Sequence, residues 1–200
     1  MKQENEKFGN KNAKLKETIE WLESVLIAIV FVIVLSSFFF RIVTISGPSM
    51  QNTLFNGDRI IISNMFYTPT CGDVVVISRN YYNENSTQTD VAEPIIKRII
   101  ATEGMIVDID FENGFVYVDG VLLEEEYIKN PTYNKWDVEF PLVVGENEVF
   151  VLGDNRMESM DSRDSRIGLI DERHILGKAL FRIYRTSDYR NSFFDMFGGI

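Results

Sequence analysis

Three short segments carry side chains that could perform nucleophilic catalysis. The first is residues 46–54, where Gly47 and Pro48 precede Ser49 and can hold its hydroxyl in a fixed position. Such a turn also leaves the Ser49 backbone N–H able to point at an oxyanion. A Gly-Pro-Ser turn is common in proteins, so this segment alone indicates no more than a candidate nucleophile.

The second segment, residues 93–100, places a lysine within an apolar run. Because alternate residues of a strand share a face, Lys97 would lie beside Ile95 and Ile99. Burial disfavours the ammonium, whereas an ordinary lysine is uncharged only about once in 2,500 at pH 7. Lys97 is therefore a candidate general base. The alternative is a lysine that reaches solvent from a strand edge.

The third segment is residues 153–163, GDNRMESMDSR, directly after an expected strand. Its Asp and Arg side chains can pair and fix the loop. The fixed loop can then present a hydroxyl, such as that of Ser159, to a neighbouring group. The alternative interpretation is a salt-bridged turn without a chemical role.

In this order, the three segments resemble those of bacterial type I signal peptidases. Residues 153–163 match the family pattern GDNRxxSxDSR at every fixed position, and Ser49-Met50 and Lys97-Arg98 match two further family motifs. The resemblance extends from residue 21 to about residue 182. The single apolar span and the modest length are similar to the compact form found in Gram-positive bacteria.

The resemblance implies a serine endopeptidase that removes N-terminal signal peptides from exported preproteins after Ala-x-Ala-like sites. Ser49 would be the nucleophile, Lys97 its general base and Ser159 the residue that orients Lys97, without a histidine. The substrate would add as an extended strand. The implied loop scaffold consists of Asp154, Arg156, Asp161 and Arg163, and the implied pocket residues are Met50 and Ile96. The resemblance implies no cofactor and no metal.

The chain departs from the family pattern near the serine. Asn52 stands where the family often has proline, and Gly47 stands where some members carry a hydroxyl that helps the oxyanion hole. We therefore expect the Ser49 N–H to do most of that work. Further along, Gly104-Met105 stands where the family often has Gly-Asp.

An apolar segment and a β-rich domain must position these residues. The apolar segment comes first in the chain. Residues 24–40 contain seventeen residues without a charge. As a helix they would cover about 26 Å, which suffices to cross a hydrocarbon core. A buried core helix would show a polar face, and a cleaved secretory signal would end in small residues rather than in Phe38, Phe39, Phe40 and Arg41. The segment predicts an uncleaved membrane anchor.

Charge next to this segment predicts its orientation. Five lysines precede it, whereas only Arg41 and Arg59 fall in the twenty residues after it. Cytoplasmic flanks carry the excess of basic residues. We therefore expect residues 1–20 to be a cytoplasmic tail, 21–40 a single-pass anchor in the cell membrane and 41–200 an exoplasmic catalytic domain. Ser49 would lie at most about 30 Å along the chain from Phe40, close to the lipid bilayer.

The rest of the chain predicts a mostly β domain built of antiparallel strands. Short β-rich runs alternate with turn residues, and Asn113-Gly114 supplies a hairpin turn. Residues 79–93 are polar and predict a loop or insertion. The aromatic residues Phe193, Phe194 and Phe197 are candidates for contact with the membrane interface. The expected strands are residues 59–63, 73–78, 95–100, 105–111, 114–118 and 148–152.

Composition excludes several other classes of protein. The 200 residues include 20 basic and 30 acidic side chains, and the net charge of −10 argues against nucleic acid as a partner. Cys71 is the single cysteine, which excludes an internal disulfide, and His174 is the single histidine. Two alternatives stay open: a catalytically inactive membrane-anchored adaptor, and a self-cleaving Ser/Lys protease of the LexA type, which would instead carry a DNA-binding domain.

Overall fold

The computed structural model describes residues 2–78 and 94–185. It divides the chain into two compact units, Met1–Phe40 and Arg41–Ile200. The expected insertion at residues 79–93 and the aromatic residues Phe193, Phe194 and Phe197 lie outside the described residues.

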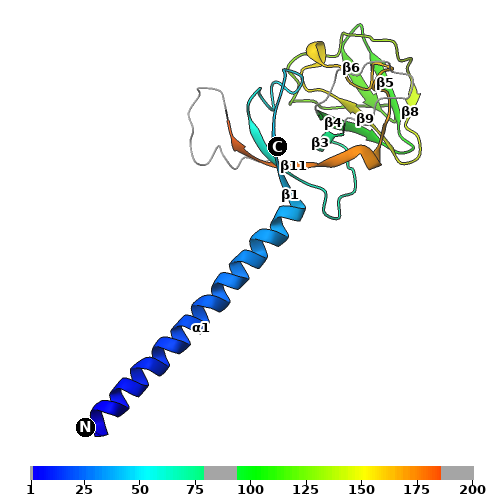
Figure 1. Cartoon of the computed structure of the whole chain (residues 1–200). Coiled ribbons are helices and arrows are strands. Elements are labelled where there is room, and N and C mark those ends of the chain that lie inside the picture. The colour runs from blue at the N-terminus through cyan, green and yellow to red at the C-terminus, as the bar shows by residue number, and fades with distance from the viewer. Residues whose placement is uncertain (1, 79–93, 186–200) are drawn as a thin grey trace. The chain divides into compact units, whose positions relative to one another are not determined.

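The first unit is a single helix, α1 (Lys2–Phe39) (Figure 1). It includes the polar N-terminal segment as well as the apolar one. Its stretch Lys16–Ser37 has a mean hydropathy of 2.3, and none of that stretch is buried by the rest of the chain. The helix is long and apolar enough to cross a membrane. Side chains such as Leu26, Ile27 and Phe31 are exposed, as lipid-facing residues are.

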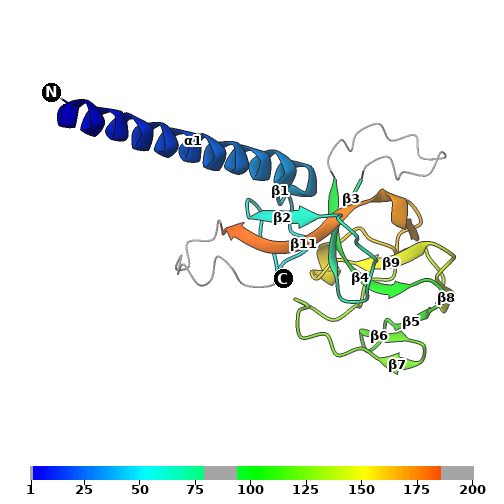
Figure 2. The same ribbon diagram turned by 90° about the horizontal axis from the view of Figure 1, so that it is seen from below.

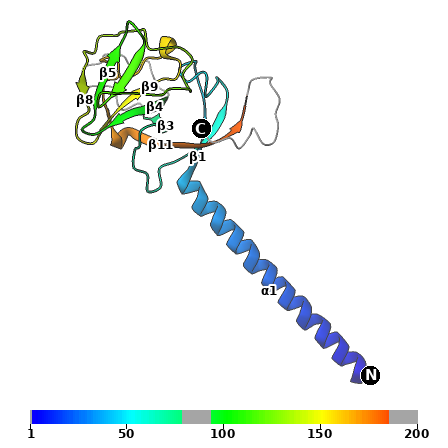
Figure 3. The same cartoon turned by 180° about the vertical axis from the view of Figure 1, so that it is seen from behind.

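The second unit contains a seven-stranded sheet with the order β1-β2-β11-β3-β4-β9-β10. The long strand β11 lies between β2 and β3 (Figures 1 and 2), and β4 lies beside β9 (Figure 3). The pairs from β2 to β10 are antiparallel. The strands are β1 (Phe40–Thr44), β2 (Arg59–Ser63), β3 (Val74–Ile77), β4 (Ile95–Thr102), β9 (Glu148–Leu152), β10 (Ile170–Asp171) and β11 (Ile175–Tyr184).

A smaller sheet has the order β7-β6-β5-β8. Its strands are β5 (Ile106–Asp110), β6 (Phe115–Val118), β7 (Val121–Leu122) and β8 (Leu142–Val143). The expected hairpin joins β5 and β6, with Gly114 at φ +76°. A second hairpin joins β6 and β7 through Asp119 and Gly120, which both have positive φ, as a two-residue hairpin turn requires. The predicted mostly β fold is confirmed.

The centre of the larger sheet is strand β4. Its sequence IIKRIIAT is rich in β-branched residues, and residues 96–101 are all buried. The buried apolar side chains form three clusters, which include Ile60, Ile99 and Val107 respectively. Two of the buried residues in β4, Lys97 and Arg98, carry charges, and their partners define the candidate site.

Candidate active site

Ser49 lies in a turn that follows β1. The chain enters it through Gly47, whose φ of +88° favours glycine, and Pro48. The Gln51 N–H donates to the Pro48 carbonyl at 3.1 Å, and the Leu54 N–H donates to the Met50 carbonyl at 2.8 Å. These hydrogen bonds close the turn and leave Ser49 half-buried with its hydroxyl directed at β4.

Lys97 meets this hydroxyl from β4. Its Nζ donates to Ser49 Oγ at 2.9 Å and to the Ile96 carbonyl at 3.0 Å. The side chain is 3% exposed, so Lys97 does not reach solvent from a strand edge. The two residues expected to form a Ser/Lys pair are therefore in hydrogen-bond contact.

The surroundings of Lys97 make its uncharged form more common than it is in a solvent-exposed lysine. Burial lowers the pKa of its ammonium to about 8, and the nearby charge of Arg163 acts in the same direction. The carboxylates of Asp161 and Asp154 oppose this and raise the pKa. With a pKa of about 8, about a tenth of the molecules carry an uncharged Lys97 at pH 7.

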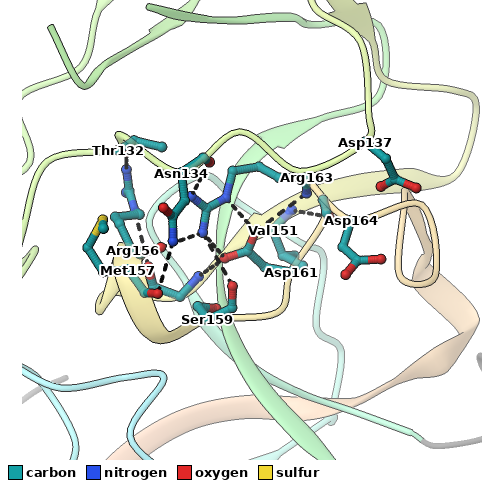
Figure 4. A network of polar contacts seen from close by, with 12 residues as sticks. Thr132, Asn134, Asp137, Val151, Arg156, Met157, Ser159, Asp161, Arg163 and Asp164 are labelled. Carbon is teal, nitrogen blue, oxygen red and sulfur yellow. Dashed lines mark hydrogen bonds and ion pairs between the residues drawn. The ribbon is translucent and has the colours of Figure 1, made fainter. Parts of the chain in front are cut away.

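Arg163 fixes the loop of residues 153–163 from within (Figure 4). Its Nε donates to Asp161 Oδ1 at 2.8 Å and its NH2 to Asp161 Oδ2 at 2.9 Å. The guanidinium also donates to the backbone carbonyls of Asn134 and Arg156. Asp161 in turn accepts from the Gly153 N–H at 3.0 Å. The expected scaffold pair Asp161–Arg163 is formed, and both side chains are fully buried.

The other two scaffold residues pair outside the loop. Asp154 accepts from Nε and NH2 of Arg98, at 2.9 and 2.7 Å. Arg156 pairs with Glu125 and donates to Thr132. Asp154 also accepts from the Thr53 hydroxyl in the serine turn. Sequence reasoning did not find Thr53, Glu125 and Thr132. Strand alternation placed Arg98 on the face of β4 opposite Lys97, but it did not indicate the buried partners of Arg98.

Asn155 connects this loop to the turn that carries Ser49. Its backbone N–H donates to the Ser49 carbonyl at 2.9 Å and its Nδ2 to the Pro48 carbonyl at 3.2 Å. Gly153 permits this approach, because a Cβ there would lie 2.6 Å from the Ser49 carbonyl oxygen. The same Cβ would lie 2.2 Å from Ser159 Oγ. The loop therefore packs against the serine through a position that only glycine fits.

Ser159 lies behind Gly153 and is buried. Its Oγ has no hydrogen-bond partner in the described part of the chain. The expected contact with Lys97 is thus not formed, and Lys97 donates instead to the Ile96 carbonyl. Ser159 remains a buried hydroxyl available to a nearby donor.

A groove of about 600 Å³ begins next to the serine turn. Val43 and Ser46 line it from the chain before Ser49, and Ile96 lines it from β4. The prediction that Ile96 lines a pocket fits this groove. Met50 does not line this groove: its side chain is 1% exposed and packs into the core with Leu54, because the turn directs it inward. Among the described residues, no cluster of three His, Cys, Asp or Glu side chains offers a metal site.

The sequence profile of the signal peptidase family, peptidase S26, matches residues 18–184. The chain belongs to this family. It is therefore a serine peptidase, and the resemblance of its motifs to signal peptidases is confirmed. The site described above lies within the matched residues, and so does the stretch of α1 long enough to span a membrane.

Individual signal peptidases are similar to this chain over most of its length. Probable signal peptidase I-1 of Synechocystis is 36% identical over 180 residues, 86% of this chain and 84% of its own. Signal peptidase IB of Staphylococcus aureus is 31% identical over 196 residues, 89% of this chain and 95% of its own. A crystal structure of a signal peptidase I from Enterococcus faecalis superposes with a TM-score of 0.43 at 26% identity, over 56% of this chain and 97% of that one.

Proposed function

We propose that this signal peptidase removes N-terminal signal peptides from exported preproteins with Ser49 as nucleophile and Lys97 as general base. The observation that carries the proposal is the 2.9 Å contact between Lys97 Nζ and Ser49 Oγ, made by a lysine that is almost fully buried. Burial supplies an uncharged amine near neutral pH, which is the form that accepts a proton.

The reaction begins when the Ser49 hydroxyl donates to the uncharged Lys97. The proton moves from Oγ to Nζ while Oγ bonds to the scissile carbonyl carbon, whose oxygen takes the negative charge. Collapse breaks the C–N bond, and the Lys97 ammonium returns its proton to the departing amine of the mature protein. A water molecule then gives a proton to Nζ and its oxygen attacks the ester carbon. The proton finally returns to Ser49, and the signal peptide leaves as an acid.

Two further groups serve this chemistry. The Ser49 N–H donates to no acceptor in the described part of the chain, and it is the donor for the developing oxyanion. In the reacting complex the Ser159 hydroxyl accepts from the Lys97 amine and directs its lone pair toward Ser49. Asp161 and Arg163 hold the loop that carries Ser159, while Asp154 and Arg156 hold its first residues, so these four residues are structural.

Substrate selection follows from β4 and the groove. Ile95, Ile96 and Lys97 pair with β3 on one side, whereas the pairing with β9 begins at Arg98. A signal peptide adds as a strand along this open edge, so that its backbone provides affinity. Its side chains next to the scissile bond enter the groove beside Ile96, which favours small residues and gives cleavage after Ala-x-Ala.

The helix α1 anchors the enzyme in the cell membrane. With the lysine-rich N-terminus in the cytoplasm, the β domain lies outside. A cleavage site lies just beyond the membrane-embedded part of its signal peptide. Ser49 follows Phe40 by nine positions in the chain, so the anchor keeps the serine within reach of such a site.

The test uses the full chain in lipid vesicles with a preprotein that carries an Ala-x-Ala site. We expect the wild type to release a product whose new N-terminus follows that site. Ser49→Ala abolishes the release, and Ser78→Ala, a serine of the same unit outside the site, retains it. Replacing the last alanine of the signal peptide by tryptophan prevents cleavage. A wild-type chain that leaves the preprotein intact would overturn the proposal in favour of an adaptor.

A further inference from the structure

The guanidinium of Arg98 is the junction of the polar network beside the serine turn. It makes a two-point contact with Asp154 and donates to the Gly72 carbonyl at 2.7 Å. Asp154 accepts in turn from Thr53, four residues after Ser49. The position of this one guanidinium thus fixes the start of the 153–163 loop relative to the turn that carries the nucleophile.

The planar face of that guanidinium is covered by Tyr127. The Arg98 Cζ lies 4.0 Å from the centroid of the Tyr127 ring, within the range of a cation–π contact. Tyr127 comes from the irregular segment between β7 and β8, far from Arg98 in sequence. The contact therefore joins a segment that connects two strands of the small sheet to the central strand of the large one.

The hydroxyl of Tyr127 closes the network. It donates to Glu125 at 2.9 Å, Glu125 binds Arg156, and Arg156 Nε donates to the Gly153 carbonyl at 3.0 Å. Gly153 is bonded to Asp154, which returns to Arg98. This closed set of contacts holds the Gly153 carbonyl on one side and the Asp154 carboxylate on the other. Gly153 is also the residue at which the loop packs against Ser49.

We propose that Tyr127 is a positioning residue for the Ser49–Lys97 pair, which it orders through Arg98 and Asp154. The inference deepens the function proposed above and rests on it. Tyr127 touches neither Ser49 nor Lys97 in the contacts described. Its effect is to hold the face of the Arg98 guanidinium against the ring while the guanidinium edge pairs with Asp154. The negative charge of Asp154, which acts on Lys97, is thereby neutralised in a fixed geometry.

The charges around both residues give this role a measurable consequence. Lys97 faces Asp161 and Asp154, which raise its pKa, and Arg163, which lowers it. Tyr127 faces Glu125, Arg156 and Arg98. Loss of the aromatic face loosens Arg98, so Asp154 is neutralised less and stabilises the Lys97 ammonium more. The acidic limb of the pH–rate profile then moves to higher pH.

The experiment measures preprotein cleavage by the full chain in lipid vesicles between pH 6 and 10. In Tyr127→Leu we expect the midpoint of the acidic limb of kcat/KM to rise by about half a pH unit, with about a threefold loss at pH 7. Tyr127→Phe loses the hydrogen bond to Glu125, which stays paired with Arg156, but keeps the aromatic face over Arg98, so we expect it to retain the wild-type midpoint. Tyr133→Leu, which removes an exposed tyrosine of the same segment, also leaves the midpoint unchanged.

The outcomes separate this inference from the proposed function. An unmoved midpoint in Tyr127→Leu overturns the inference even if its activity falls, while cleavage by the wild type leaves the proposed function standing. A wild-type chain without cleavage overturns both. Should Tyr127→Leu fail to fold, Tyr127→Met, which keeps bulk without an aromatic face, takes its place and faces the same criterion.

Discussion

The backbone N–H of Asn155 donates to the carbonyl of Ser49 at 2.9 Å. A second hydrogen bond from Asn155 Nδ2 holds the preceding carbonyl, that of Pro48, at 3.2 Å. The loop after β9 thus hydrogen-bonds directly to the backbone of Ser49, the proposed nucleophile. A loop whose own interior is fixed by the buried Asp161–Arg163 pair transmits that rigidity to Ser49.

Replacing Gly153 by alanine should disable the enzyme. Its Cβ would lie 2.6 Å from the Ser49 carbonyl oxygen and 2.2 Å from Ser159 Oγ, so the backbone of the turn that carries Ser49 must move. Because displacements of this size misalign reacting atoms, we expect at least a 100-fold loss of kcat/KM, roughly the cost of a 1 Å misplacement. The measurement is preprotein cleavage at pH 8.

Gly145→Ala is the matched control for that substitution. Its Cβ would also meet an oxygen at 2.3 Å, but this is Oε2 at the flexible end of Glu148, which can move aside. The variant should cleave at close to the wild-type rate. Equal losses in the two variants would show that close packing against Ser49 is not what makes Gly153 necessary.

Arg98→Met should destabilise the β domain strongly. It leaves Asp154, which is fully buried, without its guanidinium partner. Breaking a buried pair in this way costs about 3–5 kcal/mol of the free energy of unfolding. Arg173→Met is the control, because its pair with Asp171 is largely solvent-exposed and contributes little. Urea unfolding in detergent measures both, and similar unfolding free energies for the two variants would contradict the account.

The burial of Lys97 makes stability depend on pH. Above pH 8 the folded chain releases the proton from Lys97, whereas the unfolded chain keeps it up to about pH 10.5. The unfolded state then binds more protons, so stability rises with pH across this window. Relative to Lys97→Met, the unfolding free energy of the wild type should rise by about 3 kcal/mol between pH 8 and 10.5. A constant difference between the two proteins would refute a buried, uncharged lysine.

The proposed orientation is testable with the single cysteine. Cys71 is exposed on the β domain, so a thiol reagent that cannot cross membranes should label it in intact cells. Cys71→Ser is the control for specificity. If labelling required permeabilised cells, the β domain would face the cytoplasm and the proposed topology would be wrong.

The alternation of β-rich runs with turn residues predicted strands that contain no glycine. The strands at residues 59–63 and 148–152 have the predicted bounds, and β4 extends two residues further than expected. Strand β11 was missed although it lies between β2 and β3. It contains Gly177, which weakens a strand pattern. Glycine is needed there, since a Cβ would lie 2.9 Å from the Ser63 backbone, a contact that no sequence window contains.

In the site, too, local sequence predicted some residues and missed those whose roles depend on tertiary contacts. The resemblance of the motifs to signal peptidases selected Ser49 and Lys97, which the fold brings into contact, and strand alternation predicted that Lys97 and Arg98 lie on opposite faces of β4. Glu125 and Tyr127 had no such signal, because they lie in an irregular segment and gain their roles only through tertiary pairing with Arg156 and Arg98. The burial of Met50 in the core could not be predicted, because a motif position does not indicate which side of a turn faces the core.

The most direct test of the Ser49–Lys97 pair compares two variants in one assay. Preprotein cleavage is measured at pH 8 for the full chain, for Lys97→Met and for His174→Ala, which removes the single histidine. A lysine base predicts that Lys97→Met loses at least about a thousandfold in kcat/KM, while His174→Ala stays within a few-fold of the wild type. The opposite pattern, with loss in His174→Ala and cleavage retained in Lys97→Met, would contradict the mechanism.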